Sequence, residues 1–372
     1  VAAGRADIFD RNGTVLATSL PTASLFADPH DIMDAEEAAD KLATVFPEIN
    51  RNELLHKLKS NSRFVWISRN LTPNQQYAVN RLGIPGVSFE HGERRVYPHG
   101  REAAHVLGLT DVDGNGIAGV EKYFATSLNK GAEPLQLSID LRIQAMLRQE
   151  LTAAVSEFQA IGAAGIVLDV QTGEIISMVS LPDFDPNIPD SMIGTVAFNR
   201  ATKGVYEMGS TFKLFTTAMA LDSGTVSIDD GYDASEPIKI ARFTISDYHG
   251  KNRWLSVPEI LVYSSNIGSA KMAMDVGAKA QKFYLDQFGL LHQSAVELPE
   301  IGLPQYPARW GDISTMTISY GHGVSVSALQ LADGVAALVN GGIRLPVTLL
   351  KHRGTTPPAG IRVLSEQTSK QM

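Results

Sequence analysis

Cysteine is absent from all 372 residues. Disulfide bridges and thiolate metal sites are therefore excluded. The sequence also lacks any run of 18 apolar residues, so we expect no helix that spans a membrane. The first residues lack the charged and apolar parts of a signal peptide, and the chain starts at Val1 where a complete protein would have Met. We therefore expect a fragment of a longer protein.

Metal-binding patterns are missing as well. The nine histidines show no spacing such as His-x3-His. The stretch 111–124 has the Asp and Gly of a calcium loop, but its twelfth residue is Lys122 where a Glu is required, which indicates an ordinary turn. The formal net charge of −8 argues against a nucleic-acid partner. We expect no metal and no cofactor.

The chain is long enough for two domains, with 44% hydrophobic residues. Residues 1–134 are rich in turn signals, with a helical pattern over 34–59 that Pro47 interrupts. From about residue 135 the pattern changes to a short strand and a long amphipathic helix. Two β-branched runs in 165–180 flank a turn and predict a hairpin. We therefore predict domains at 1–134 and 135–372.

Ser210 and Lys213 lie three positions apart after Gly209, at the start of an uninterrupted helical pattern. They fall on one face of this helix, beside an apolar stripe. A serine hydroxyl becomes a good nucleophile only when a base takes its proton. Burial could lower the pKa of a lysine enough for it to serve as that base, and free N–H groups at a helix start can stabilise an oxyanion.

Two other interpretations remain open for this stretch. Ser-x-x-Lys occurs about once by chance in a chain of this length, so Ser210 could simply cap a helix whose Lys213 is exposed. A phosphate-binding loop over 204–211 would need a lysine directly after its second glycine, and Ser210 stands there.

Farther along, Ser264-x-Asn266 lies 54 positions after Ser210. Ser-x-x-Lys followed by Ser-x-Asn is the order found in penicillin-recognising acyl enzymes. With this pair in place, the chain resembles the class B penicillin-binding proteins, and most closely their division-specific branch. The resemblance extends over nearly all 372 residues, and its longest matches are "ERRVYPHGREAAHVLGLTDVDGNGIAGVEKYF", "VLDVQTGEIISMVSLPDFDPN", "FNRATKGVYEMGSTFK" and "RWGDISTMTISYGHGVSVSALQLA".

This resemblance implies a fold of mixed α+β or α/β type. An extended, non-catalytic N-terminal pedestal, of the dimerisation type, would precede a transpeptidase domain similar to serine β-lactamases, with helices around an antiparallel sheet. The implied activity is D,D-transpeptidation of peptidoglycan during septal wall synthesis. The implied ligands are stem pentapeptides that end in D-Ala-D-Ala, and β-lactams, which mimic that end.

The resemblance also implies a role for each matching residue. Ser210 would attack the penultimate D-alanine carbonyl, and Lys213 would take the serine proton. Ser264 would relay a proton to the leaving amine, while Asn266 would hold the substrate amide and Lys213. Tyr320 and Gly321 would lie in a loop that contacts substrate.

The same family likeness places the parent protein on the periplasmic side of the inner membrane, with an anchor upstream of Val1. Its partners would be glycan-polymerising and division proteins. An elongation-specific transpeptidase, a serine β-lactamase and a non-catalytic division scaffold are the alternatives.

Two features depart from the family pattern. Met208 stands where the family usually has proline. The third family motif, Lys-Thr-Gly, is not found, and the C-terminal part of the transpeptidase domain is expected to be missing. We therefore expect this chain to be nearly inactive by itself. His322 has no carboxylate near it in the sequence, which favours a structural role for this residue.

Overall fold

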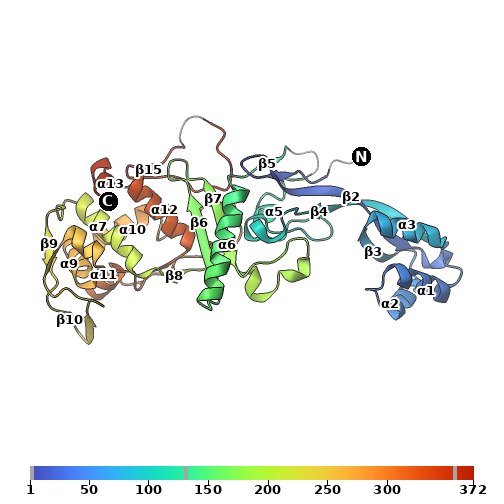
Figure 1. Cartoon of the computed structure of the whole chain (residues 1–372), viewed down its shortest axis with the longest axis horizontal. Coiled ribbons are helices and arrows are strands. Elements are labelled where there is room, and N and C mark those ends of the chain that lie inside the picture. The colour runs from blue at the N-terminus through green and yellow to red at the C-terminus, as the bar shows by residue number, and fades with distance from the viewer. Residues whose placement is uncertain (1–3, 130–132, 355–357) are drawn as a thin grey trace.

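The computed structural model describes residues 4–129, 133–354 and 358–372. These residues form an elongated molecule with three parts in a row (Figure 1). We call them the distal lobe (residues 22–92), the central body (mainly residues 4–21, 93–129, 133–205, 294–309 and 345–354) and the site lobe (mainly residues 206–293, 310–344 and 358–372). The distal lobe and the central body each have one buried apolar cluster, and the site lobe has two.

The distal lobe packs three helices against three antiparallel strands. Leu25 of one strand, Leu42 and Leu54 of two helices, and Phe46 directly after the first of these helices are fully buried in its core. The two helices flank Pro47, as the sequence predicts. The elements are β2 (Val15–Ala27), α1 (Ala35–Val45), α2 (Arg51–Leu58), β3 (Val65–Leu71), α3 (Pro73–Leu82) and β4 (Val87–Val96).

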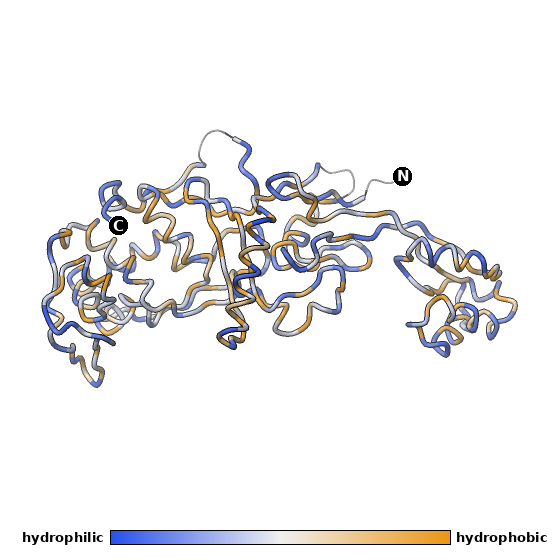
Figure 2. The backbone as a smooth tube through the Cα atoms, in the orientation of Figure 1, coloured by the Kyte–Doolittle hydropathy of each residue, from blue (hydrophilic) through white to orange (hydrophobic). Residues whose placement is uncertain are grey.

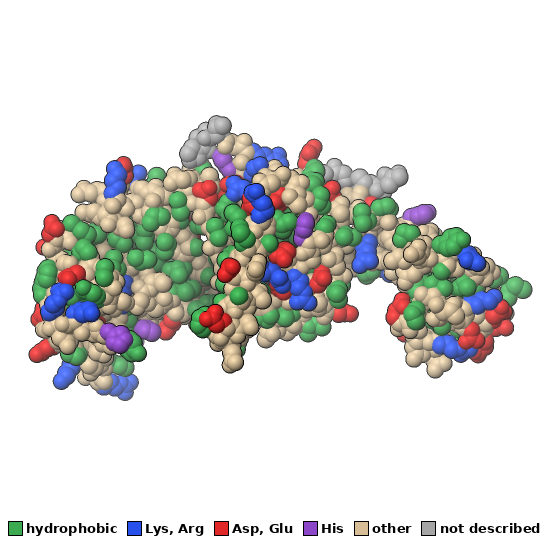
Figure 3. Space-filling view, viewed as in Figure 1, with side chains coloured by type: hydrophobic (Ala, Val, Ile, Leu, Met, Phe, Trp, Pro, Cys, Tyr) green, Lys and Arg blue, Asp and Glu red, His purple; other side chains and the backbone are tan. Residues whose placement is uncertain are grey.

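A narrow neck joins the distal lobe to the central body. It consists of β2 and β4, which pair antiparallel in an unbroken register from Thr18↔Val96 to Ala27↔Val87. Most residues of β4 are exposed or half-buried. The space-filling view shows the neck as the thinnest part of the molecule (Figure 3).

The central body is built around an antiparallel hairpin, which confirms the prediction for residues 165–180. All seven residues of its second strand are buried, and a long helix packs against it. The core of this body draws on Ile8 and Leu16 as well as on Ile175 and Leu349, so it takes residues from both sides of position 134. The domain boundary at 134/135 stays a prediction. The elements are β1 (Ile8–Phe9), α4 (Ala104–Leu107), α5 (Gly119–Tyr123), β5 (Leu135–Gln136), α6 (Leu141–Glu157), β6 (Ala163–Leu168) and β7 (Ile175–Leu181).

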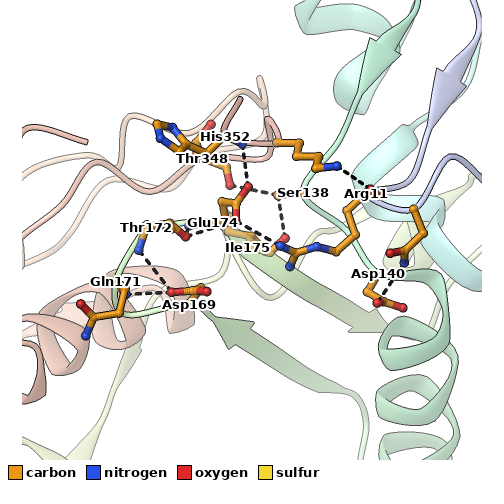
Figure 4. Close-up of polar contacts among 12 residues, drawn as sticks. Arg11, Ser138, Asp140, Asp169, Gln171, Thr172, Glu174, Ile175, Thr348 and His352 are labelled. Atoms are coloured by element: carbon orange, nitrogen blue, oxygen red, sulfur yellow. Dashed lines mark hydrogen bonds and ion pairs between the residues drawn. The ribbon is translucent and has the colours of Figure 1, made fainter. Parts of the chain in front are cut away.

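A buried carboxylate joins the N-terminal segment to the turn of this hairpin. Glu174 is only 4% exposed. It accepts hydrogen bonds from the Arg11 guanidinium at 3.3 Å, from the Thr172 hydroxyl at 3.2 Å and from the His352 backbone N–H at 2.6 Å. Figure 4 shows these groups converging on Glu174 from three separate segments. Since a buried charge is costly unless it is paired, this contact fixes the three segments together.

The site lobe is mostly helical, with short two-stranded ribbons at its margin. Phe212, Phe215 and Phe288 form the centre of its main core. The elements are β8 (Tyr206–Glu207), α7 (Phe212–Asp222), β9 (Gly231–Asp233), β10 (Ile238–Ile240), β11 (Phe243–Ile245), β12 (Trp254–Ser256), α8 (Val257–Val262), α9 (Asn266–Val276), α10 (Ala278–Gln287), α11 (Asp312–Ile318), β13 (Ser325–Val326), α12 (Ala328–Val339), β14 (Ile343–Arg344), β15 (Ile361–Arg362) and α13 (Glu366–Gln371).

Hydrophobic and hydrophilic segments alternate along the whole backbone (Figure 2). Across the described residues, no helix has both the length and the apolar character needed to cross a bilayer.

Candidate active site

The backbone bends sharply just before α7. Gly209 has a φ of 56° and Gly321 a φ of 86°, in the left-handed region that favours glycine. The Gly209 N–H donates to the Gly321 carbonyl at 3.3 Å, and a Cβ on Gly321 would lie 2.0 Å from the Gly209 carbonyl oxygen. Only glycine fits at position 321, which lets the loop after α11 touch the start of α7.

Ser210 follows this bend in a single 3-10 turn, Gly209–Thr211, that leads into α7. Ser210 is exposed, and it makes no side-chain capping hydrogen bond to the helix. Instead its hydroxyl oxygen accepts a hydrogen bond from Lys213 Nζ at 3.0 Å. The interpretation of Ser210 as a simple helix cap is therefore wrong.

Lys213 lies one turn farther and is only 2% exposed, which also excludes a solvated lysine. Besides Ser210, its Nζ donates to Ser264 Oγ at 2.8 Å and to the Ser264 carbonyl at 2.7 Å. An ammonium group has three donors, and all three find acceptors here. Through the Lys213 Nζ atom, the Ser-x-x-Lys motif thus contacts Ser264, the first residue of the Ser-x-Asn motif.

Burial lowers the pKa of Lys213 to about 8, while the carboxylate of Asp247 acts in the opposite direction. A lysine with an ordinary pKa is almost entirely charged at neutral pH. With a pKa of about 8, roughly a tenth of the molecules carry a neutral amine at pH 7. Lys213 can therefore accept a proton from a neighbouring hydroxyl.

Ser264 occupies the short turn between α8 and α9 and has a φ of 53°. For a residue with a side chain this conformation is uncommon, and neighbouring contacts must hold it. Ser265, fully buried, begins α9 as its N-cap and accepts the Gly268 N–H at 2.9 Å. Asn266 is half-buried, and its Nδ2 donates to the Ser246 carbonyl at 3.0 Å. The expectation that Asn266 holds Lys213 is wrong, because the three hydrogen bonds of Lys213 Nζ go to Ser210 and Ser264.

Tyr320 and Gly321 belong to the loop that follows α11. Tyr320 is half-buried, and burial raises the pKa of its phenol. The next residue after Gly321, His322, pairs with Glu207 at 3.1 Å. Glu207 also accepts the Gly323 N–H at 2.7 Å, so it ties this loop to the segment before Ser210. The expectation that His322 lacks a carboxylate partner is wrong, because Glu207 lies 115 positions away in the sequence.

Like Glu207, Asp247 lies at the site although the sequence patterns did not indicate it. Its two carboxylate oxygens contact Ser265 and Ile267, directly beside the Ser264 turn. It precedes Ser265 by 18 positions in an irregular segment, where no periodicity or motif marks it.

Within the described ranges, no three His, Asp or Glu side chains gather into a group that could hold a metal ion. The site as observed consists of hydroxyls, one amine, one amide and the start of α7. This set of groups is suited to acyl transfer through a serine ester.

Comparison with protein families agrees with this chemistry. The family model for the penicillin binding protein transpeptidase domain matches residues 163–372, and the model for the penicillin-binding protein dimerisation domain matches residues 1–132.

Individual relatives were also found. The probable peptidoglycan D,D-transpeptidase FtsI of Caulobacter vibrioides is 41% identical over 376 residues, which cover 100% of this chain and 64% of that protein. The probable peptidoglycan D,D-transpeptidase PenA of Neisseria meningitidis is 34% identical over 405 residues, which cover 100% of this chain and 68% of that protein. The chain thus spans about two thirds of the length of these relatives.

Among solved structures, a peptidoglycan synthetase from Bifidobacterium adolescentis superposes with a TM-score of 0.77 at 21% identity, covering 100% of this chain and 79% of that one. At this level of identity the likeness concerns the fold. It confirms the expected mixed α/β architecture, in which a dimerisation-type N-terminal module accompanies a transpeptidase domain.

Proposed function

Since this chain belongs to the penicillin-binding protein transpeptidase family, we propose that it is the major part of a serine-type peptidoglycan D,D-transpeptidase active in septal wall synthesis. One observation carries the proposal. The buried Lys213 Nζ lies 3.0 Å from Ser210 Oγ and 2.8 Å from Ser264 Oγ, so a single amine can exchange protons with both hydroxyls.

In the first half-reaction, Ser210 Oγ attacks the carbonyl carbon of the penultimate D-alanine of a stem peptide. Lys213 takes the hydroxyl proton as the bond forms. The Ser264 hydroxyl, in contact with Lys213, passes a proton to the nitrogen of the departing D-alanine. The C–N bond breaks, terminal D-alanine leaves, and an ester to Ser210 remains.

The start of α7 supports this step electrostatically. Negative charge develops on the carbonyl oxygen in the transition state, and N–H groups at a helix N-terminus favour negative charge. Ser210 stands at that terminus, and no side chain caps it. Asn266, beside Ser264, would hold the amide of the bound peptide.

In the second half-reaction, an amine from a neighbouring stem peptide attacks the ester carbonyl. The amine loses a proton through Ser264 and Lys213, and the Ser210 oxygen regains one. The product is a cross-link between two stems. A β-lactam enters the same first half-reaction, but its opened ring stays attached to Ser210.

The septal role rests on likeness to the FtsI and PenA proteins. The proposal extends to a location on the periplasmic face of the inner membrane and to glycan-polymerising and division proteins as partners.

The test is intact-mass spectrometry after incubation with benzylpenicillin. Two forms are compared: this chain, and the protein extended to the length of its relatives. Each is accompanied by a Ser210→Ala variant. A long-lived adduct on the extended form that disappears in Ser210→Ala supports the proposal.

The other outcomes point to the alternatives. An adduct that is hydrolysed within minutes indicates a serine β-lactamase. No adduct on either folded form contradicts acyl transfer and favours a scaffold. Measuring division against elongation defects after depletion of the gene product separates the septal from the elongation role.

A further inference from the structure

Asp247 lies in the irregular segment between β11 and β12 and is half-buried. Its Oδ2 accepts the Ser265 hydroxyl at 2.7 Å, and its Oδ1 accepts the Ile267 N–H at 3.0 Å. The preceding carbonyl, of Ser246, accepts Asn266 Nδ2 at 3.0 Å. Two adjacent residues of this segment therefore contact three consecutive residues at the start of α9.

These contacts hold the turn that presents Ser264. The Ser265 hydroxyl donates to Asp247 and accepts the Gly268 N–H, so it is held from both sides. Ser264 itself has an unfavourable left-handed backbone, and its hydroxyl and carbonyl both face Lys213. Without the anchor at Asp247, only the contacts of Ser264 with Lys213 would still oppose relaxation of the left-handed turn.

Asp247 also acts on Lys213 by its charge. A carboxylate near an ammonium favours the charged form of the amine, in opposition to burial. The other titratable groups on the segments around Lys213 are either neutral or engaged with partners of their own. Tyr320 is a neutral phenol, while Lys271 of α9 donates to the Asp233 carbonyl and Glu259 of α8 pairs with Arg253. Glu207 and His322 pair with each other at the exposed margin.

We propose that Asp247 is a positioning residue of the acyl-transfer site, which locks the Ser264 turn against α7 and supplies the negative charge that acts on Lys213. This rests on the proposed function of that site. The Asp247 side chain would thus have two separable effects, one on the geometry of the Ser264 turn and one on the protonation of Lys213.

The two effects are separated by measuring the rate of penicillin acylation from pH 5 to 10 in the extended protein. Asp247→Asn keeps the shape and the acceptor for Ile267 but loses the charge. We expect a lower plateau rate and a profile that moves to lower pH by about half a unit, or roughly threefold in the relative rate at pH 7. Asp247→Glu keeps the charge, and its profile should stay at the wild-type pH while the plateau falls.

Matched variants sharpen the result. Ser265→Ala removes the hydrogen bond but leaves the carboxylate, so the plateau should fall with no shift of the profile. Asp230→Asn changes a carboxylate of the same lobe that accepts the Ser227 N–H and that has no contact with the Ser264 turn, and it should leave both quantities unchanged. Equal profiles for wild type and Asp247→Asn would overturn the charge effect, and equal plateaus for wild type, Asp247→Asn and Ser265→Ala would overturn the positioning effect.

A measurement that does not need acylation distinguishes failure of this inference from failure of the proposed function. The Nζ signal of Lys213 in ¹⁵N-lysine-labelled protein, assigned by its loss in Lys213→Arg, reports the protonation of the amine directly. We expect its titration midpoint to fall in Asp247→Asn. An unchanged midpoint contradicts the inference even if wild-type protein forms the Ser210 adduct, whereas a lowered midpoint without any adduct contradicts only the proposed function.

Discussion

The two helix starts that meet at Lys213 are opposites. The start of α9 is capped by two side chains: Ser265 accepts the Gly268 N–H, and Asp247 accepts the Ile267 N–H. The start of α7 has no side-chain cap and passes through a 3-10 turn that is held by a backbone contact to Gly321. The rigid start carries the group that relays protons. The uncapped start carries the nucleophile, where unused N–H groups are of value to an incoming carbonyl.

The largest effect should come from removing the amine that links the two starts. Lys213→Arg places a guanidinium there, which stays charged at all relevant pH values. We expect the acylation rate of the extended protein to fall by about 10³-fold or more, because loss of a general base typically costs 10²–10⁴-fold. Lys203→Arg, at an exposed lysine before the same helix, is the control. A Lys213→Arg rate within tenfold of wild type would show that another group takes the proton.

The second largest effect should come from breaking the backbone contact between Gly209 and Gly321 at the uncapped start of α7. Gly321→Ala forces a Cβ to within 2.0 Å of the Gly209 carbonyl oxygen and adds the strain of a positive φ. We expect a loss of about 3 kcal/mol in the free energy of unfolding, measured by urea denaturation. Gly323→Ala has a similar φ of 89° but no atom closer than 3.7 Å, so it should cost only about 1 kcal/mol. Equal losses would mean that the close approach to Gly209 is not maintained in solution.

At the capped start, Ser265→Ala should lower the free energy of unfolding by about 2 kcal/mol, because it removes a buried cap and leaves Asp247 with an unpaired oxygen. Ser327→Ala removes another buried cap, that of α12, which has no carboxylate partner, and should cost about 1 kcal/mol. Thermal unfolding of the two variants compares them directly. A smaller loss for Ser265→Ala would argue that the Asp247 contact contributes nothing.

The smallest effect concerns Glu207, which joins the loop after α11 to the segment before Ser210. The Gly323 N–H and His322 lower the pKa of Glu207. A carboxylate with a lowered pKa stabilises the fold above its unfolded pKa of 4.5, and this contribution is lost as the pH falls through the folded value. Glu207→Gln should therefore cost about 0.5 kcal/mol at pH 7, since the pair is exposed, and progressively less as the pH falls below 4.5. An equal cost at pH 7 and at pH 3 would assign the effect to shape and not to charge.

Local patterns predicted much of this arrangement. The three-residue spacing of Ser210 and Lys213, beside an apolar stripe, predicted a shared face next to a buried one, and Lys213 is indeed buried. The helices on either side of Pro47 and the hairpin of β6 and β7 follow from breakers and alternation that are visible within short windows. The family resemblance is confirmed by the matches to both family models.

Contacts between distant segments could not be predicted in this way. Asp247 and Glu207 act through partners that lie 18 and 115 positions away, and no local pattern records such a distance. The same holds for the core of the central body, which joins Ile8 to Leu349 across the expected boundary at 134. Packing between segments decides these features, and single-sequence periodicity reports only on one segment at a time.

The neck between the distal lobe and the central body has a mechanical consequence. The buried clusters on its two sides share no residue, and only the paired β2 and β4 strands run through it. A load applied to the distal lobe would thus be carried by this two-stranded ribbon and by the ion pair between Arg69 of β3 and Asp113 of the central body, at 2.7 Å. The orientation of the distal lobe therefore depends on a ribbon and on an ion pair between partly exposed side chains, whereas the contacts around Lys213 lie against the buried core of the site lobe.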